Sequence, residues 1–187
     1  MYITSLDYVF DIEKLITECN NLVNSVGLHK HHNQISLKHT AINYNKDLWY
    51  EGCGSLKYSF GEDFIDTNGK LVEQEHKLSQ SDFTIVNALL DNTYLKEVID
   101  IVSKDYIIGR VRLMALPHKK CMSIHTDTTQ RIHIPIVTNE NCLMIINNIV
   151  HHMPANGGAY LTDTRKPHTA INANHSFMRL HILFDLV

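Results

Sequence analysis

Six short apolar runs, separated by turn residues, occupy the chain from residue 107 to residue 184. They are rich in β-branched and large apolar side chains, which favour strands. The runs are Ile107–Leu116, Arg131–Val137, Cys142–Ile146, Ala159–Thr162, His168–Ile171 and Phe177–Phe184. Helical patterns do not alternate with these runs, which argues against a parallel doubly wound sheet. The spacing therefore predicts a mainly β fold, either a sandwich or a jelly roll.

Two of these runs carry Arg and His at alternating positions. Arg131 and His133 alternate with isoleucines, and Arg179 and His181 alternate with apolar residues. Successive side chains of a strand point to opposite faces, so each strand has one apolar face and one face that bears Arg and His. The polar face could meet solvent, or it could meet a ligand inside a barrel, and the strand pattern leaves both interpretations open.

The first 106 residues contain two helical patterns. Apolar residues at three- and four-residue steps predict a helix over 11–27, capped by Asp11 and Gly27. A second helix is predicted over roughly 92–104. Between the helices, Ile35–Ile42 alternates in part and is predicted as a strand, while the glycines and polar side chains of 52–81 predict loops with short strands.

This pattern predicts how the chain is organised. We expect residues 1–106 to form an N-terminal α/β extension packed on a core formed by residues 107–187. The helices should cover one face of that core, because amphipathic helices bury their apolar stripe against a sheet. A chain of 187 residues fits one compact domain that needs no disulfides to fold.

Histidine is the unusual component, with 13 residues in the chain. The run His125-Thr-Asp127 places two metal-ligating side chains at positions i and i+2, which point the same way on a strand and can share one ion. His168 follows 43 residues later and Arg179 a further 11 residues on. Two His and one carboxylate can occupy one face of an octahedral ion, an arrangement typical of non-heme Fe(II) that leaves three positions open.

Open positions of this kind suit a chelating co-substrate such as 2-oxoglutarate together with O₂. The distal carboxylate of 2-oxoglutarate would then need a cation some way from the metal. Arg179 is suited to this task, because its guanidinium bonds a carboxylate with two parallel hydrogen bonds and stays charged.

Several motifs agree in order and spacing with one known family. They are His125-Thr-Asp127, Arg131-Ile-His133-Ile-Pro135, Thr138-Asn139, Gly158-Ala-Tyr160, His168-Thr-Ala-Ile-Asn172 and Arg179-Leu-His181 followed by Asp185. Through them, residues 107–187 resemble the aspartyl/asparaginyl β-hydroxylases, which are Fe(II)- and 2-oxoglutarate-dependent dioxygenases. The best-known animal members lack the carboxylate ligand, so Asp127 makes the chain more like the bacterial and viral-type branch.

The resemblance implies a double-stranded β-helix core, that is, a cupin-like jelly roll, with Arg and His faces turned inward. The iron ligands and catalytic residues it implies are His125, Asp127 and His168. Arg179 would hold the distal carboxylate of 2-oxoglutarate, and Arg131 and His133 would help to hold this co-substrate.

The implied reaction is hydroxylation of an unactivated carbon, with succinate and CO₂ as co-products. The substrate would be an amino acid or a peptidyl side chain, of the Asp/Asn or proline type. Two alternatives remain: a non-catalytic cupin-like module that binds a metal or a small acid, and a Zn-dependent hydrolase or isomerase on the same fold. Arg179 with Arg131 and His133 argues against the hydrolase, which needs no dedicated clamp for a dicarboxylate. A binding module could keep this clamp but would form no succinate with O₂.

The composition limits which partners and which compartment we expect for the chain. A net charge of −3 gives no broad basic surface, so no nucleic-acid partner is expected. No run of 18 apolar residues and no secretory signal are visible, so we expect no membrane span and a cytoplasmic protein. The four scattered cysteines are predicted to be reduced thiols.

The cluster His29, His31 and His32 could bind a metal or form a polar loop, and the loop is the favoured interpretation.

Overall fold

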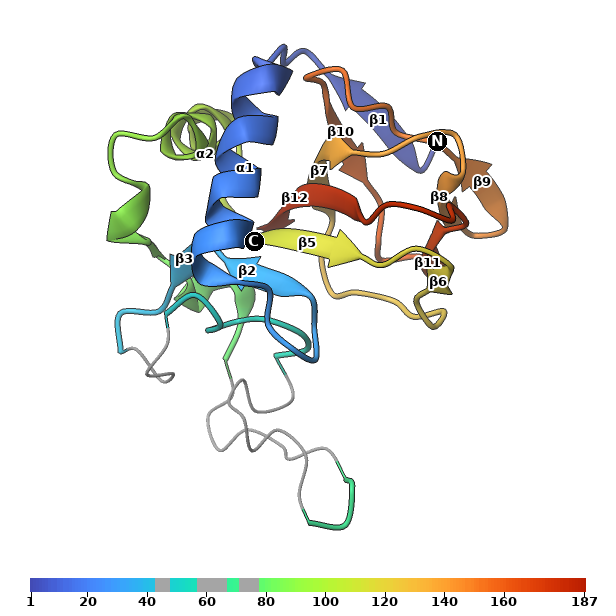
Figure 1. Ribbon diagram of the computed structural model, residues 1–187, viewed down its shortest axis with the longest axis horizontal. Coiled ribbons are helices and arrows are strands. Elements are labelled where there is room, and N and C mark those ends of the chain that lie inside the picture. Colours follow the sequence, from blue (N-terminus) through green and yellow to red (C-terminus); the bar gives the residue numbers. More distant parts are fainter. Residues whose placement is uncertain (43–47, 57–66, 71–77) are drawn as a thin grey trace.

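The computed structural model describes residues 1–42, 48–56, 67–70 and 78–187, so much of the predicted loop region 52–81 lies outside the described residues (Figure 1). Most of the described residues lie in strands or in the segments that connect them. In chain order the elements are β1 (Ile3–Leu6), α1 (Ile12–Val26), β2 (Gln34–Ser36), β3 (Lys38–His39), η2 (Gln80–Asp82), β4 (Ile85–Val86), η3 (Ala88–Leu90), α2 (Tyr94–Asp105), β5 (Ile108–Leu116), β6 (Lys120–Cys121), β7 (Arg131–Val137), β8 (Cys142–Ile146), β9 (Ile149–His151), β10 (Ala159–Thr162), β11 (His168–Asn172) and β12 (Arg179–Leu186).

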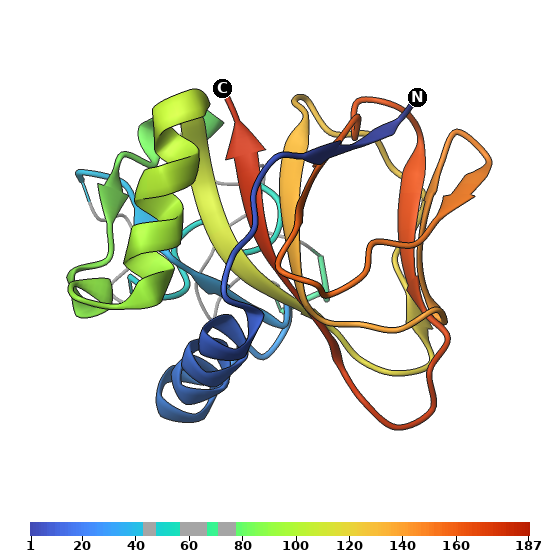
Figure 2. The ribbon, with the colours of Figure 1, turned by 90° about the horizontal axis from the view of Figure 1, so that it is seen from above.

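Two antiparallel sheets face each other. The larger has the strand order β1-β10-β7-β12-β5-β2, and the smaller has the order β6-β11-β8-β9. Figure 2 shows the two sheets on either side of the barrel, with both helices on the far side of the larger sheet. This is the expected mainly β jelly roll with helices on one face.

The large sheet draws strands from both ends of the chain. β1 pairs with β10, and β2 pairs with β5. The two edge strands therefore come from the first 40 residues of the chain, and the four strands between them come from the last 80 residues. The central strand β12 pairs with β5 on one side and β7 on the other. The division into an extension over 1–106 and a core over 107–187 stays a prediction.

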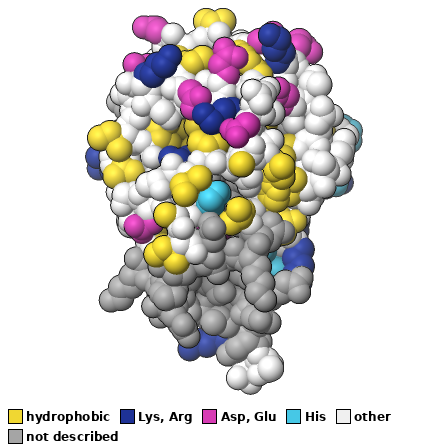
Figure 3. Space-filling model, turned by 90° about the vertical axis from the view of Figure 1, so that its left-hand side faces the viewer, with side chains coloured by type: hydrophobic (Ala, Val, Ile, Leu, Met, Phe, Trp, Pro, Cys, Tyr) yellow, Lys and Arg dark blue, Asp and Glu magenta, His cyan; other side chains and the backbone are white. Residues whose placement is uncertain are grey.

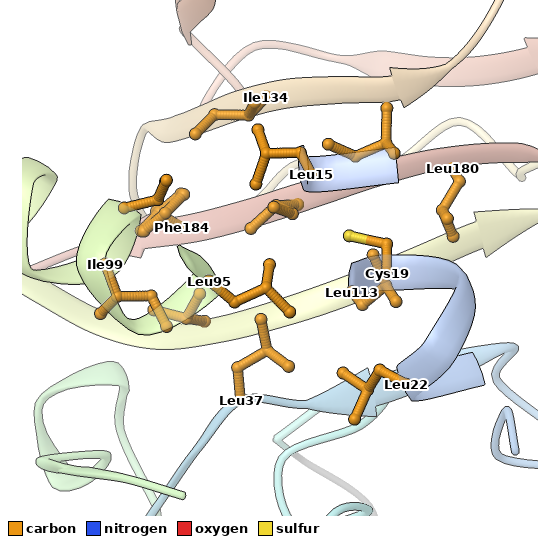
Figure 4. Packing of buried hydrophobic residues seen from close by; sticks show 14 of the residues in the cluster. Leu15, Cys19, Leu22, Leu37, Leu95, Ile99, Leu113, Ile134, Leu180 and Phe184 are labelled. Atoms are coloured by element: carbon orange, nitrogen blue, oxygen red, sulfur yellow. The ribbon is translucent and has the colours of Figure 1, made fainter. Parts of the chain in front are cut away.

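The main hydrophobic core lies between the helices and the large sheet. Leu15 and Cys19 of α1 and Leu95 of α2 are buried against Ile134 and Phe184 of the sheet (Figure 4). These sheet residues belong to the apolar strand faces described above. The Arg and His faces of β7 and β12 consequently point away from the helices, toward the small sheet.

The first helix begins and ends as its sequence predicts, whereas the second runs over Tyr94–Asp105 instead of over 92–104. The Asp11 side chain accepts a hydrogen bond from the amide of Lys14, and Gly27 ends α1 at a positive φ of 83°. Thr93 caps α2 in the same way. The two helices are also joined, because the carboxylate of Glu18 on α1 accepts hydrogen bonds from the first amides of α2, those of Tyr94 and Leu95.

Three predicted strands match the structure at both ends, and the others shift slightly. Arg131–Val137, Cys142–Ile146 and Ala159–Thr162 are β7, β8 and β10. The last strand begins at Arg179 instead of Phe177, since Asn172 anchors the preceding turn through the carbonyls of Leu116 and Phe177. The single strand predicted over Ile35–Ile42 is wrong in its extent: it is divided into β2 and β3, and Ile42 is exposed.

The helix-bearing side of the molecule shows acidic and basic side chains intermixed in its upper half (Figure 3). Neighbouring opposite charges of this kind fit the small net charge of the chain. Within the described residues, no helix is both long and apolar enough to cross a membrane.

Candidate metal centre

Two backbone hydrogen bonds bring the predicted metal ligands together. His125 and His168 form an isolated antiparallel bridge, with N–O distances of 3.1 and 2.9 Å. Asp127 follows two residues after His125, and its amide donates to the carbonyl of Thr164 at 2.9 Å. This pairing places the short segment around Asp127 beside the start of β11.

The ligand atoms of the three side chains converge. One nitrogen from each of His125 and His168 and one oxygen of Asp127 lie within 4.8 Å of one another. Nε2 of His168 is 3.3 Å from Oδ2 of Asp127, and Nε2 of His125 is 3.9 Å from Oδ1. Among the described residues no other group of three His, Cys, Asp or Glu side chains meets this criterion, so a three-ligand site at His29, His31 and His32 finds no support.

Backbone carbonyls orient both imidazole rings. Nδ1 of His125 lies 2.8 Å from the carbonyl oxygen of Ser123, and Nδ1 of His168 lies 2.9 Å from that of Lys166. Nδ1 must donate in these bonds, which leaves Nε2, on the side of Asp127, as the ring nitrogen that can bind a metal. The donor set therefore fits a divalent transition metal: two imidazoles, oriented by the backbone, and one carboxylate.

Asp127 is ionised in this setting. Burial raises the pKa of its carboxyl, but the interactions with His168, Arg131 and His125 outweigh burial and bring the pKa below its usual value. The three side chains differ in exposure. The side chain of His125 is 32% exposed, that of Asp127 is 15% exposed and that of His168 is 3% exposed. The site is thus closed on the side of β11 and open on the side of His125.

A cavity of about 1240 Å³ lies on that open side. Its walls include His125, Asp127 and Arg131 from the jelly roll and His31 and His32 from the loop after α1. Burial, with the nearby His29, His31 and Arg112, lowers the pKa of His32 to about 4, so this ring is neutral at pH 7. The histidine cluster that the sequence placed in a polar loop therefore belongs in part to the wall facing the metal ligands.

The other predicted residues lie deeper in the barrel, outside the lining of this cavity. Arg179, His133 and His181 are all at most 5% exposed. An amino group of Arg179 lies 3.1 Å from Nδ1 of His181, which in turn lies 3.4 Å from Nδ1 of His133. Burial, with the Arg179 charge next, holds the pKa of both histidines well below its usual value, so both rings are neutral.

Arg179 is a buried cation that no described carboxylate contacts. No ion pair joins it to an Asp or Glu among the described residues, and burial lowers its pKa to about 10 against a smaller opposing effect of Cys142. Nε2 of His133 and Nε2 of His181 are likewise buried, with no hydrogen-bond partner in the part of the chain that the structure describes. Buried charge and unpaired polar atoms are costly, so a cluster of this kind is suited to an anionic ligand with further acceptors.

Arg131 has different surroundings. Its Nη1 is 2.6 Å from Oδ2 of Asp127, and its Nε is 2.5 Å from Oδ1 of the fully buried Asp185. Arg110 and Arg112 contact the other oxygen of Asp185. No role was predicted for Arg110, Arg112 or Asp185, although two arginines at alternating positions inside the apolar run Ile107–Leu116 are a detectable signal of buried charge.

The chain matches one family model, described as aspartyl/asparaginyl beta-hydroxylase, over residues 64–187. No curated protein matches it. Among solved structures it resembles IDO from Bacillus thuringiensis, with a TM-score of 0.53 and 10% sequence identity, over 100% of this chain and 93% of that one. This likeness shows a shared fold.

Two further solved structures are less similar. AviO1 from Streptomyces viridochromogenes Tue57 has a TM-score of 0.45 and 13% identity, over 98% of this chain and 89% of that one. An oxidoreductase of the 2OG-Fe(II) oxygenase family from Burkholderia pseudomallei has a TM-score of 0.37 and 14% identity over 53% of this chain. The match spans 52% of that protein, about half of its length.

Proposed function

The chain belongs to the aspartyl/asparaginyl beta-hydroxylase family, and on this basis we propose that it is an Fe(II)- and 2-oxoglutarate-dependent dioxygenase. It would hydroxylate an unactivated carbon of an amino acid or of a peptidyl side chain, of the Asp/Asn or proline type, and release succinate and CO₂. The observation that carries the proposal is the convergence of two oriented imidazoles and one carboxylate beside a large cavity.

His125, Asp127 and His168 would hold the iron. When bound, the iron and the 2-oxoglutarate would supply the activation of O₂, which is chemistry that side chains alone do not provide. The protein supplies orientation: the carbonyls of Ser123 and Lys166 fix the imidazoles, and Arg131 contacts the carboxylate. Because both imidazoles must be neutral to bind a metal, affinity should fall as they become protonated.

Arg179 would bind the distal carboxylate of 2-oxoglutarate. The support is its buried guanidinium, which has no carboxylate partner among the described residues and would gain a charge-assisted pair with the ligand. His133, whose Nε2 is buried and has no partner within the described segments, would contribute a hydrogen bond to the same co-substrate. The co-substrate role expected of Arg131 stays a prediction, and its two carboxylate contacts favour a different task, considered below.

The substrate would enter through the cavity next to His125 and Asp127. A volume of about 1240 Å³ can admit an amino acid or an extended side chain. The wall opposite the metal ligands comes from His31, His32 and the segment around Gly54, so residues of the N-terminal part would take part in substrate selection.

The test uses protein stripped of metal with a chelator and then loaded with Fe(II) or Zn(II). Succinate is measured after addition of 2-oxoglutarate in air, with candidate amino acids and Asp- or Asn-containing peptides. Succinate formation that requires Fe(II), O₂ and His168 supports the proposal. Substrate turnover with Zn(II) in the absence of O₂ would instead support the hydrolase or isomerase, and metal binding without any turnover would support the binding module.

A further inference from the structure

Asp185 is a fully buried carboxylate on the central strand of the large sheet. Guanidiniums reach it from both neighbouring strands. Arg131 of β7 contacts Oδ1 at 2.5 Å, while Arg112 and Arg110 of β5 contact Oδ2 at 2.7 and 3.0 Å. Burial raises the pKa of this carboxyl, but the charges of Arg112, Arg110 and Arg131 hold it well below its usual value, so Asp185 is ionised.

Arg131 links this buried cluster to the candidate metal ligands. Its guanidinium uses Nε for Asp185 and Nη1 for Asp127, so one rigid plane joins two carboxylates. The contact with Asp185 is a hydrogen bond and the contact with Asp127 is an ion pair, and a planar guanidinium held between two carboxylates has less freedom than a lysine ammonium on its flexible stem. The position of the Asp127 carboxylate is therefore coupled, through Arg131, to the carboxylate of Asp185.

Asp127 needs such a restraint because it lies in a connection and not in a strand. It falls between β6 and β7, where its amide donates to the carbonyl of Thr164. That bond fixes the backbone, but the carboxylate can still rotate about its terminal torsion, which has a broad preference. The contact with Arg131 restricts this rotation.

We propose that Asp185 is a positioning residue for the metal site: it holds Arg131, and Arg131 fixes the orientation of the Asp127 carboxylate. The inference rests on the proposed function, since it requires Asp127 to be a metal ligand. It gives Arg131 a task in metal binding and gives Asp185, which lies outside the ligand set, an effect on the metal.

A purely structural role for Asp185 makes different predictions. Arg110 also bonds the carbonyls of Gly52 and Gly54, and Arg112 also bonds Gln34, so Asp185 helps to tie the N-terminal segments to the sheet. If that were its only task, its replacement would lower stability and leave the metal affinity of the folded protein unchanged. A positioning residue must change the affinity and the ligand geometry of the bound metal.

The experiment measures Co(II) binding by visible absorption, which reports both affinity and ligand geometry, at a temperature where circular dichroism shows every variant to be folded. The variants are Asp185→Asn, Asp185→Glu, Arg131→Gln and the double variant Asp185→Glu with Arg131→Gln. Asp185→Glu keeps the charge that the buried arginines need, so it remains informative if Asp185→Asn does not fold. Asp100→Asn, which alters an exposed aspartate of α2, is the control.

We expect Asp185→Glu and Arg131→Gln each to weaken Co(II) binding by about 10- to 100-fold and to alter its visible spectrum, as for groups that orient a metal ligand. The double variant should bind no more weakly than Arg131→Gln, because Asp185 acts through Arg131. Wild-type affinity in folded Asp185→Glu, or additive weakening in the double variant, would overturn the inference. If the wild type itself binds no Co(II), or if Asp127→Ala binds it equally well, the proposed metal site fails.

Discussion

His125 and His168 pair through their backbones, with each amide donating to the carbonyl of the other, and their rings lie 4.3 Å apart between centroids. Residues 43 positions apart in sequence are thus held side by side by the sheet framework and not by their side chains. The backbone pairing places both Nε2 atoms on the side of Asp127, which reduces the conformational entropy that metal binding must remove.

Asp127→Ala should abolish Fe(II)-dependent succinate formation and weaken metal binding by at least about 100-fold. The change removes the only carboxylate of the donor set and leaves Arg131 facing the remaining imidazoles. Metal affinity is measured by competition with a chromogenic chelator. Asp163→Asn, which alters an exposed ion pair with Arg165, is the matched control. Undiminished turnover in Asp127→Ala would mean that two histidines suffice.

Arg179→Ala should weaken 2-oxoglutarate binding on the order of 100-fold, the effect of losing a charge-assisted bidentate contact worth about 1.5–3 kcal/mol. Metal affinity should be nearly unchanged, because Arg179 contacts His181 and none of the proposed ligands. Anaerobic calorimetry with Fe(II)-loaded protein measures the difference, and Arg165→Ala is the exposed control. Loss of the metal in Arg179→Ala would show that Arg179 has a structural role instead.

The metal-free protein should become less stable as the pH falls below about 6.5. An unfolded histidine binds a proton near pH 6.5, whereas burial keeps the pKa of His133 and His181 well below this value in the folded protein. The unfolded state then binds more protons than the folded state, so acid favours unfolding. Each of these residues contributes a slope of up to about 1.4 kcal/mol per pH unit.

Urea denaturation at pH 7.5, 6.5 and 5.5 measures this slope for the wild type and for His181→Gln. The variant should lose less stability between pH 6.5 and pH 5.5, because one buried histidine is gone. His175→Gln, which changes an exposed histidine, should retain the full dependence. An equal slope in wild type and His181→Gln would contradict the assignment of a neutral buried ring.

Leu15→Ala should reduce the free energy of unfolding by about 2–5 kcal/mol, the usual effect of truncating a buried leucine. Leu15 is fully buried between α1 and the large sheet, so its loss leaves a cavity in the main core (Figure 4). Leu89→Ala, at a position 73% exposed, should change stability by less than about 0.5 kcal/mol. Equal effects in urea denaturation would show that α1 does not pack on the sheet as described.

Local patterns predicted much of the core. Alternation along Arg131–Val137 fixes both the strand and its two faces, and the spacing of His125, Asp127 and His168 predicts residues that the structure brings together. Local patterns could not predict that β1 would pair with β10 or that β2 would pair with β5. Such pairings depend on contacts between distant segments, which the periodicity of a single strand does not record.

Local sequence patterns also could not predict the buried cluster that Asp185 forms with Arg110, Arg112 and Arg131. Arg110 and Asp185 are 75 residues apart, and nothing near either residue in sequence indicates that they would meet. The environment of Arg131 depends on the same long-range register, in which Asp185 lies opposite Arg131 across β12 and β7. Sequence motifs therefore named Arg131 as a candidate but did not predict its contacts with Asp127 and Asp185.

An anaerobic titration of the metal-free protein, first with Fe(II) and then with 2-oxoglutarate, tests the central claim most directly. A keto acid chelated to Fe(II) at this site should produce a visible charge-transfer absorption that saturates at one equivalent and is lost in His168→Ala. That result would place metal and co-substrate together at the proposed ligands. If Fe(II) is bound and 2-oxoglutarate produces no absorption and no binding heat, the chain is not a 2-oxoglutarate-dependent oxygenase.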